Sequence, residues 1–305
     1  MLAGFVTAAI CTRNRGAALA TAVRSVLASR HPSFRLLVID QSTDEASRCA
    51  VEEFAGDPRL RYLPSNAVGV SRARNLALRN ADTDIVVFTD DDCEVHEGWL
   101  SVMQALFDEH PGVAQAFCSV RPGPHDAERE FVPAYECSSG TRIVRTLLDK
   151  CTARGMGAGM AVRRQTVLDA GGFDEELGPG ATFPSNEEGD LAVRLLMRGH
   201  QVCETDRTYV THHGSRTFTE GRTLSRRDWV GIGAAYSKPL RVGALGIVPI
   251  ALYELAFKAV GPAFVDLAHL RRPRGLARGA HFLNGFARGL LAPLDGERLL
   301  FKSPP

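Results

Sequence analysis

The stretch IVVFTDDD at residues 85–92 decides the fold of this chain, because a purely apolar run ends in three consecutive carboxylates. A buried strand of this kind carries its acids to the edge of a sheet. Three adjacent anions repel one another unless a cation shares the site. Aspartate oxygens suit Mg²⁺ or Mn²⁺, and such an ion keeps positions open for substrate phosphates. The alternative is a solvated acidic turn. An EF-hand loop is excluded, since Val95 stands where that loop requires glycine.

Short apolar runs alternate with longer amphipathic ones around this stretch. We expect strands at Phe5–Cys11, Leu36–Asp40, Arg61–Leu63, Ile85–Thr89 and Val113–Val120. We expect helices at Ala17–Ala28, Asp44–Phe54, Ser71–Arg79 and Glu97–Glu109. This order predicts an α/β fold with a mostly parallel, Rossmann-like sheet that helices cover on both faces. Ligands of such sheets bind at the carboxyl ends of the strands, where three polar clusters fall. They are the residues after Cys11, Asp40-Gln41 and Asp90–Asp92.

The composition is that of an ordinary globular protein, with 305 residues of which 45% are hydrophobic and 23% charged. A formal charge of +1 provides no overall field for nucleic acid, so we expect no nucleic-acid partner. Seven cysteines without a Cys-x-x-Cys pair indicate a reducing compartment and argue against structural zinc. Residues 5–11 lack the basic lead of a signal peptide and read as a first strand. We therefore expect the protein in the cytoplasm.

Between residues 121 and 160 the periodicity fades, as it does in loops that contact ligands. Gly155–Met160 lacks the Gly-Lys-Ser/Thr ending of a P-loop and follows no clear strand. We interpret it as a backbone turn, ending in Gly159 and Met160, that lets a ligand approach closely. Farther along we expect helices at Arg164–Ala170 and Glu187–Arg198, and strands at Gln201–Glu204 and Thr208–His212.

Three polar clusters can be read in two ways each. Glu187, Glu188 and Asp190 either cap the start of a helix or include a general base for an acceptor hydroxyl, and the sequence does not choose among the three. His212 and His213 are structural, or one of them completes a metal shell that the aspartates begin. Asp40 holds a ribose hydroxyl or base edge, or it caps the helix that begins near Asp44.

Four motifs in this order resemble the family-2 glycosyltransferases, whose catalytic domain has the GT-A fold. The first two are Phe5–Arg15 with the helix around Ala22–Leu27, and Leu36–Asp44. The third is Gly69–Asn75 running into Phe88–Asp92 and Trp99-Leu100, which ends in the Asp-x-Asp metal motif. The fourth is Gly159–Arg164 with Gly171–Glu175, followed by Glu187-Glu188-x-Asp190. The resemblance spans roughly residues 5–215.

The resemblance implies a role for each matching residue. Thr12 and Arg13 would lie along the nucleotide base, and Asp40 and Gln41 beside the base or ribose. Arg74 would lie near the acidic cluster, Asp90 and Asp91 would hold ribose or sugar, and Asp92 would ligate Mn²⁺ or Mg²⁺ with His212 or His213. Glu188 would be the base, where relatives more often have aspartate, and Gln41 stands where many relatives have a second aspartate. A glutamine side chain donates hydrogen bonds as well as accepting them, so the resemblance does not imply which nucleotide base is bound.

The resemblance thus predicts an inverting, metal-dependent glycosyltransferase. It would move a sugar from a nucleotide-diphosphate donor to an acceptor hydroxyl, on a lipid-linked or cell-surface glycan among other acceptors. One alternative is a sugar-phosphate nucleotidyltransferase, although its Gly-rich N-terminal loop is missing after Ile10. Another is a non-catalytic, membrane-attached module that binds sugar nucleotides. The intact acidic clusters argue against the last.

We expect residues 1–215 to form the catalytic domain and residues 216–305 a helical, amphipathic C-terminal region. From residue 241 to the end, nine Lys/Arg stand against four Asp/Glu, a local surplus of 9 − 4 = +5. One helical face carries Arg274, Arg278, His281 and Arg288, and the opposite face carries Leu276, Leu283, Phe286 and Leu290. Such a helix suits the inner, anionic surface of a membrane, or it packs on its own domain. Pro249 and Pro262 interrupt the apolar run before it, so we do not expect a spanning helix.

Overall fold

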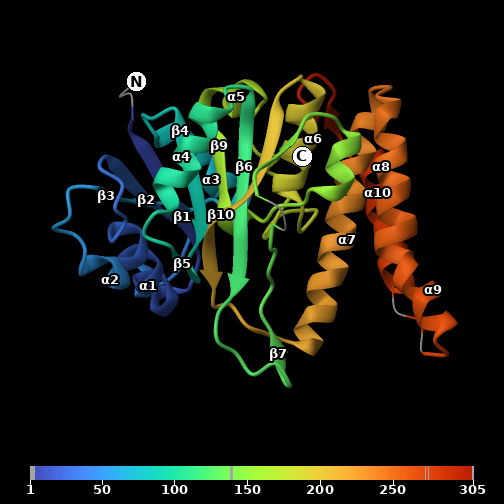
Figure 1. The fold of residues 1–305 in the computed structure, drawn as a ribbon, viewed down its shortest axis with the longest axis horizontal. Coiled ribbons are helices and arrows are strands. Elements are labelled where there is room, and N and C mark those ends of the chain that lie inside the picture. The colour runs from blue at the N-terminus through green and yellow to red at the C-terminus, as the bar shows by residue number, and fades with distance from the viewer. Residues whose placement is uncertain (1–3, 138–139, 272, 274, 304–305) are drawn as a thin grey trace.

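A computed structural model describes residues 4–137, 140–271, 273 and 275–303 (Figure 1). Its main sheet contains β1 (Val6–Thr12), β2 (Phe34–Asp40), β3 (Leu60–Pro64), β4 (Ile85–Asp90), β5 (Cys93–Val95), β6 (Val113–Pro122), β8 (Arg142–Val144), β9 (Met160–Arg163) and β10 (Gln201–His212). The helices that cover it are α1 (Gly16–Leu27), α2 (Ala46–Glu52), α3 (Val70–Asn80), α4 (Trp99–Glu109), α5 (Arg164–Asp169) and α6 (Glu187–Met197).

The sheet has nine strands, and β3-β2-β1-β4-β9-β6-β10-β5 is the order along its main path. The β1–β2, β2–β3, β1–β4 and β6–β10 pairs are parallel, whereas β9 runs antiparallel to both β4 and β6. The predicted α/β fold with a mostly parallel sheet is therefore confirmed. In the β1–β4 and β1–β2 registers Cys11 pairs with Asp90 and Thr12 with Asp40, so the three predicted polar clusters meet at one edge.

Helices bury both faces of this sheet, which explains why β4 is apolar without alternation. One core cluster joins the sheet to α1 and α4 through Val23 and Trp99. The other joins its opposite face to α3, α5 and α6 through Leu78, Val167 and Leu195. The two helical layers hold the strands in place, so the side chains at the ends of β1, β2 and β4 have fixed backbone positions.

Two predicted elements differ from the structure. Residues 157–159 form a short 3₁₀ turn, as a backbone turn requires, but Met160 then begins β9 and its side chain is buried in the core. A four-residue strand is too short to show a period in the sequence. The two strands expected at 201–204 and 208–212 are one strand, β10, with a bulge between Thr205 and Tyr209 that accommodates the polar residues between them.

The C-terminal region forms a layer of helices beside the sheet: α7 (Phe218–Arg241), α8 (Val248–Tyr253), a π-helix (Glu254–Val260), α9 (Gly261–Ala268) and α10 (Leu276–Leu291) (Figure 1). Short strand pairs, β7 (Glu130–Phe131) with β11 (Arg216–Thr217) and β12 (Leu294–Asp295) with β13 (Leu300–Phe301), flank it. Residues 245–268 are one continuous helix, long and apolar enough by composition to cross a membrane. The expected interruption at Pro249 and Pro262 is therefore wrong, because the backbone stays helical through both prolines. Each lies where the helix changes type, from 3₁₀ to α at Pro249 and from π to α at Pro262.

Glycines bring α10 against α7. A Cβ on Gly285 would lie 2.0 Å from the Val230 carbonyl oxygen, and one on Gly233 would lie 2.1 Å from the carbonyl oxygen of Phe282. The buried face of α10 therefore consists of Gly279, Phe282, Gly285 and Gly289.

This packing divides the predicted apolar face of the helix. Phe286 packs inward against Phe282, whereas Leu276, Leu283 and Leu290 face outward. On the predicted basic face, Arg288 is exposed but donates to the Thr182 carbonyl and lies over the Phe183 ring. Arg274, predicted on the same basic face, lies outside the described residues.

A buried ionic network joins α7 to the rest of the molecule. The Lys238 ammonium, with no exposed surface, lies 2.6 Å from Asp174 Oδ2 and 2.6 Å from Asp190 Oδ1. Arg194 binds the other oxygen of Asp190 at 2.8 Å. The backbone N–H of Phe301 donates to Asp174 as well, so the C-terminal strand pair is tied to the same carboxylate. Two cations thus balance two buried anions between α6, α7 and the turn after α5.

We predict that Lys238→Met lowers the free energy of unfolding by about 3–5 kcal/mol, because it leaves two buried carboxylates with one cation. Urea denaturation measures this change. Lys258→Met is the matched control: Lys258 is exposed on the π-helix, and its replacement changes stability by no more than about 0.5 kcal/mol. Equal stability of both variants would contradict a stabilising role for this network.

Candidate active site

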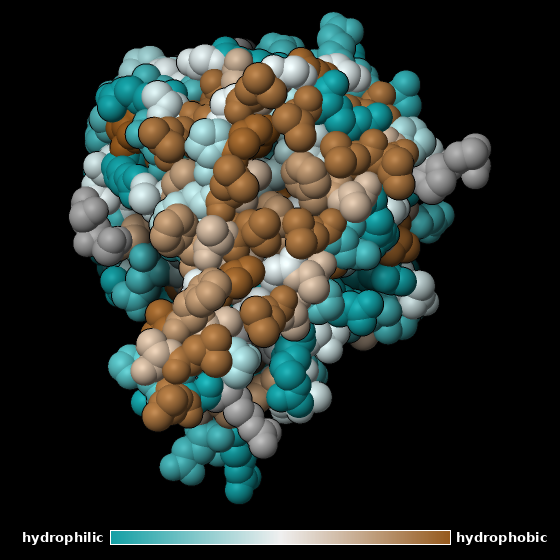
Figure 2. All heavy atoms as spheres, turned by 90° about the vertical axis from the view of Figure 1, so that its right-hand side faces the viewer, coloured by the Kyte–Doolittle hydropathy of each residue, from teal (hydrophilic) through white to brown (hydrophobic). Residues whose placement is uncertain are grey.

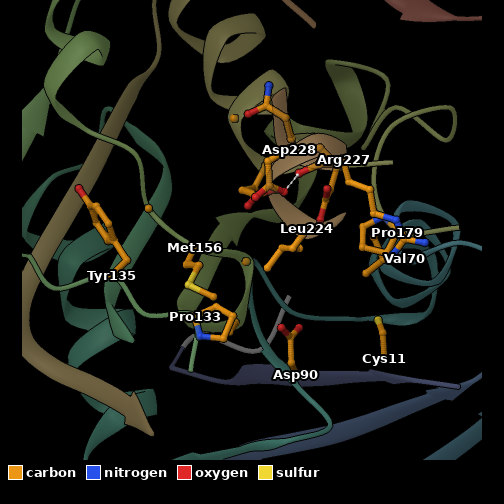
Figure 3. Close-up of a pocket in the computed structure, with 18 of the residues that line it drawn as sticks. Cys11, Val70, Asp90, Pro133, Tyr135, Met156, Pro179, Leu224, Arg227 and Asp228 are labelled. Atoms are coloured by element: carbon orange, nitrogen blue, oxygen red, sulfur yellow. Dashed lines mark hydrogen bonds between the residues drawn. The ribbon is translucent and has the colours of Figure 1, made fainter. Parts of the chain in front are cut away.

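A cavity of about 830 Å³ opens at the carboxyl ends of the strands. The ends of β1 and β4 line one side, and α7 lines the other. In Figure 3, Cys11 and Asp90 lie across the cavity from Leu224, Arg227 and Asp228. The cavity is therefore built jointly by the sheet and by the C-terminal layer, across the predicted boundary at residue 215.

The structure brings most of the predicted site residues into this cavity. Those that line it are Thr12, Arg13, Gln41, Arg74, Asp90, Asp91, Asp92, Glu187, Glu188 and His212. Five others lie outside its lining: Asp40, Gly159, Met160, Asp190 and His213. Met160 lies in the core, where the Gln115 side chain contacts its sulfur, and Gly157 and Ala158 take its expected place at the cavity wall.

The acidic cluster is neutralised by groups from three elements. The Thr12 hydroxyl donates to Asp91 Oδ2 at 2.7 Å, and Arg15 contacts Asp92 Oδ2 and, at 3.2 Å, Asp91 Oδ1. Burial raises the pKa of Asp91 to about 6, against the opposing effects of Thr12 and Arg15. Burial also acts to raise the pKa of Asp92, but His212 and Arg15 outweigh it and hold that pKa well below its ordinary value. Asp92 is therefore the anion of the cluster best suited to a cation.

Asp92 and His212 form a donor set that fits a divalent ion. His212 Nε2 lies 3.2 Å from Asp92 Oδ1, while its Nδ1 is hydrogen-bonded to the Pro133 carbonyl, which orients the ring. A Cβ on Gly214 would lie 2.4 Å from Asp92 Oδ2, so only glycine leaves this carboxylate accessible. A carboxylate with an imidazole suits Mn²⁺ better than Mg²⁺. Cys93 lies nearby, but burial raises its pKa strongly and keeps it a thiol.

His213 and Asp40 have other partners. His213 Nε2 lies 3.5 Å from Glu94, outside the cavity. Asp40 accepts from the Tyr62 hydroxyl and from the Ser42 backbone N–H, which holds the turn after β2. Gln41 uses both ends of its amide on the backbone of Gly69, at 3.1 and 3.2 Å. Gln41 therefore fixes the loop that leads into α3 and has little capacity left to read a base.

The structure separates the three candidate bases by their partners. Glu187 is paired with Arg74 at 2.7 Å, and Asp190 belongs to the buried network with Lys238 and Arg194. Glu188 lines the cavity, and its buried Oε2 has no hydrogen-bond partner among the described residues. Burial, and next the charge of Glu187, raise the pKa of Glu188 to about 8, although Arg74 opposes them. Of the three, Glu188 alone has a cavity-lining carboxyl group with an oxygen that accepts no hydrogen bond from the described residues.

Residues that the sequence did not indicate form the far side of the cavity. Leu224, Asp228, Ile232 and Tyr236 follow one another at intervals of four along α7 and line it together. The sequence shows this spacing, but the spacing alone does not indicate that this face of the helix lines a cavity. Trp229 and Glu254 complete this side, and Glu254 is paired with Arg154 at 2.6 Å. Arg15 was also missed, although it stands in the turn that carries the first motif.

Solved structures share this fold across nearly the whole chain. A mannosyltransferase from Pyrobaculum calidifontis, in complex with GDP-Man and Mn²⁺, has a TM-score of 0.61 at 19% identity and matches 93% of this chain and 86% of its own. S. aureus TarS 1–349, in complex with UDP, has a TM-score of 0.56 at 17% identity and matches 94% and 90%. These neighbours are GT-A glycosyltransferases, so the predicted GT-A fold is confirmed.

Sequence comparison identifies the family. A pre-mycofactocin glycosyltransferase of Mycobacterium tuberculosis is 28% identical over 238 residues, which are 76% of this chain and 46% of that protein. The chain thus spans about half the length of this curated relative. The sequence profile of glycosyl transferase family 2 matches residues 7–172, more than half of the chain. This protein therefore belongs to glycosyl transferase family 2.

Proposed function

We propose that the protein is an inverting, divalent-metal-dependent enzyme that transfers a sugar from a nucleotide-diphosphate donor to an acceptor hydroxyl. One observation carries this proposal: Glu188, whose Oε2 has no hydrogen-bond partner in the described part of the chain, shares a cavity with the Asp92–His212 pair. A base and a binding site for a charged leaving group are the two parts that a direct displacement requires. The complexes of the solved neighbours with GDP-Man and with UDP support the class of donor.

In the proposed reaction Glu188 removes the proton of the acceptor hydroxyl. The acceptor oxygen then bonds to the anomeric carbon from the face opposite the diphosphate, and the bond from that carbon to the diphosphate oxygen breaks. A single displacement inverts the anomeric configuration and releases a nucleoside diphosphate. Asp92 and His212 would hold the ion, which supplies positive charge to stabilise the leaving diphosphate. Arg74 keeps Glu187 paired, so Glu187 does not compete for the proton.

The two alternatives differ in their products. A nucleotidyltransferase releases pyrophosphate, and a non-catalytic module releases nothing. The unpaired Glu188 favours glycosyl transfer, since neither alternative needs a base at that place. Incubation with UDP-, GDP- and dTDP-sugars, with and without Mn²⁺, followed by assay for nucleoside diphosphate and for pyrophosphate, distinguishes all three.

We expect Asp92→Ala to abolish metal-stimulated transfer and to weaken Mn²⁺ binding while the protein stays folded, because its partners Arg15 and His212 keep their contacts with Asp91 and with the Pro133 carbonyl. Electron paramagnetic resonance of bound Mn²⁺ and turnover with a nucleotide sugar measure the two effects. His213→Ala is the control, because His213 is the adjacent histidine but lies outside the cavity. Near-normal turnover of Asp92→Ala with Mn²⁺ would contradict the assignment of the metal site.

Glu188→Gln should lower kcat by about 10²-fold or more with little change in donor affinity, because a base acts in the transition state. In the unsubstituted enzyme kcat/KM should rise with pH, since the raised pKa leaves Glu188 protonated at low pH. Glu187→Gln removes a like charge and frees Arg74, so it should move this rise to lower pH while transfer persists. If Glu188→Gln lost donor binding in parallel, or if Glu187→Gln removed the pH dependence, Glu188 would not be the base.

We also infer that the enzyme works in the cytoplasm, on the inner surface of a membrane. The seven cysteines are free thiols, as expected of a reducing compartment. Of the sixteen exposed large hydrophobic side chains among the described residues, twelve lie between Leu245 and Leu291. Figure 2 shows apolar side chains running along the face that α8, α9 and α10 form. We call this the apolar strip, made of Leu245, Val248, Leu252, Phe257, Phe264, Val265, Leu267, Leu270, Leu276, Leu283, Leu290 and Leu291.

Charge identifies the surface that the apolar strip fits. The two acids between residues 245 and 291, Glu254 and Asp266, are both buried, whereas Lys258 and Arg271 are exposed. The strip therefore offers hydrophobic and cationic side chains and no exposed carboxylate among its described residues, which matches an anionic bilayer. Only 28% of the most apolar part of the helix at residues 245–268 is buried. The same helix also places Glu254 in the cavity, so one layer of helices would contact the membrane with its outer face and line the proposed active site with its inner face.

Flotation with phosphatidylglycerol or phosphatidylcholine vesicles tests this attachment. The full chain should float with the anionic vesicles, and less at high salt. Phe257→Asp with Phe264→Asp should lower the floating fraction about fivefold or more. Phe218→Asp, an exposed phenylalanine outside the strip, should float normally. If the full chain did not bind vesicles, or if the double variant and Phe218→Asp floated alike, the membrane would not be the partner of this surface.

A further inference from the structure

Arg15 contacts Asp92, which the proposed metal site requires, and the neighbouring Asp91. Its Nη1 contacts Asp92 Oδ2 and lies 3.2 Å from Asp91 Oδ1. The residue stands in the turn between β1 and α1, and its carbonyl accepts from the N–H groups of Ala18 and Leu19, so its backbone is fixed at the start of the helix. Its side chain is 40% exposed and lines the cavity. The guanidinium is thus anchored at one end and free to move at the other.

The Arg15 guanidinium and a divalent ion would compete for the Asp92 carboxylate. His212 faces Oδ1 of Asp92 and Arg15 contacts Oδ2, so both oxygens are engaged. An ion that binds Asp92 would lie close to the fixed positive charge of Arg15, which never deprotonates in a protein. The repulsion between them favours movement of the side chain away from the carboxylates. The diphosphate of a donor would offer the nearest new anion, and a guanidinium binds such oxygens in pairs.

We propose that Arg15 is a counter-ion that neutralises Asp91 and Asp92 until metal and donor bind together, and then moves to the donor diphosphate. This inference rests on the proposed metal site. It makes Arg15 a donor-binding residue and a source of coupling: metal binding frees Arg15 for the diphosphate, and the diphosphate draws Arg15 from the metal site. Each ligand then raises the affinity for the other.

The neighbouring arginines of the cavity do not fit this role. Arg74 is buried, and it is held by Glu187 at 2.7 Å between the rings of Phe88 and Phe173. Arg13 lines the cavity and is exposed, but its side chain makes no ion pair with the acids of the described residues. Arg15 alone of these three combines contact with the acidic cluster and the freedom to leave it. Arg13 therefore provides a matched control of equal charge, two residues away.

Mn²⁺ binding followed by electron paramagnetic resonance, with Mn²⁺ alone and with Mn²⁺ plus UDP or GDP, tests the proposal without turnover. With Mn²⁺ alone, Arg15→Ala should bind about tenfold more tightly than the unsubstituted protein, because the competing cation is gone. The gain in Mn²⁺ affinity on adding nucleotide should shrink in this variant. Arg15→Lys, which keeps the charge, should remain close to the unsubstituted protein, and Arg13→Ala should leave the affinity for Mn²⁺ alone unchanged.

The outcomes separate this inference from the metal site itself. Equal Mn²⁺ affinities of Arg15→Ala and the unsubstituted protein would overturn the role of Arg15 and leave the metal site standing. Tighter Mn²⁺ binding in Arg13→Ala as well would mean that the loss of any nearby positive charge has this effect, and it would also overturn the role of Arg15. Absence of Mn²⁺ binding in all four proteins would overturn both the metal site and this inference. The thermal midpoint of each variant, with and without Mn²⁺, establishes folding and should rise most with Mn²⁺ in Arg15→Ala.

Discussion

The buried ammonium of Lys238 is the interaction on which the rest of the molecule depends. It binds one carboxylate from the turn after α5 and one from α6, and it comes from α7. A buried charge is tolerated only where its partners are in place, so these three segments have one mutual arrangement. That arrangement sets Glu188, on the first turn of α6, opposite the cavity-lining face of α7. The proposed general base and the far wall of the cavity are therefore positioned by the same buried ammonium group.

The two ends of the cavity handle negative charge in different ways. Near α6, Arg74 is buried and permanently paired with Glu187, which leaves Glu188 without a cation of its own. Near β4, Arg15 is half-exposed and lies on carboxylates that a metal would also bind. Burial thus makes one arginine a fixed part of the structure and leaves the other exchangeable. The same chemical pair, arginine with a carboxylate, serves a permanent role at one end and a temporary role at the other.

Close packing of glycines also explains the outer surface. Because α10 meets α7 through Gly285 and Gly289, and the π-helix through Gly279, its leucines are not needed for contact with the domain and point outward. They join the apolar residues of α8 and α9, whereas Glu254 and Asp266 turn inward. One helix hence contributes both an acid to the cavity and hydrophobic side chains to the surface. The catalytic cavity and the proposed membrane surface are opposite sides of the same layer.

The sequence alone determined the order of strands and helices from β1 to α4, because apolar runs of different period are local properties of the chain. It also determined that Asp90–Asp92, Asp40 and the residues after Cys11 meet, because parallel strands carry their carboxyl ends to one edge. Only the tertiary structure decided which acid is free. Glu187, Glu188 and Asp190 look alike along the chain, and they differ because Arg74, which pairs with Glu187, and Lys238, which pairs with Asp190, come from distant positions. The tertiary structure likewise decided the direction in which the leucines of α10 face. That direction depends on which side of the helix lets another backbone approach, and the sequence of one helix does not indicate which helix packs against it.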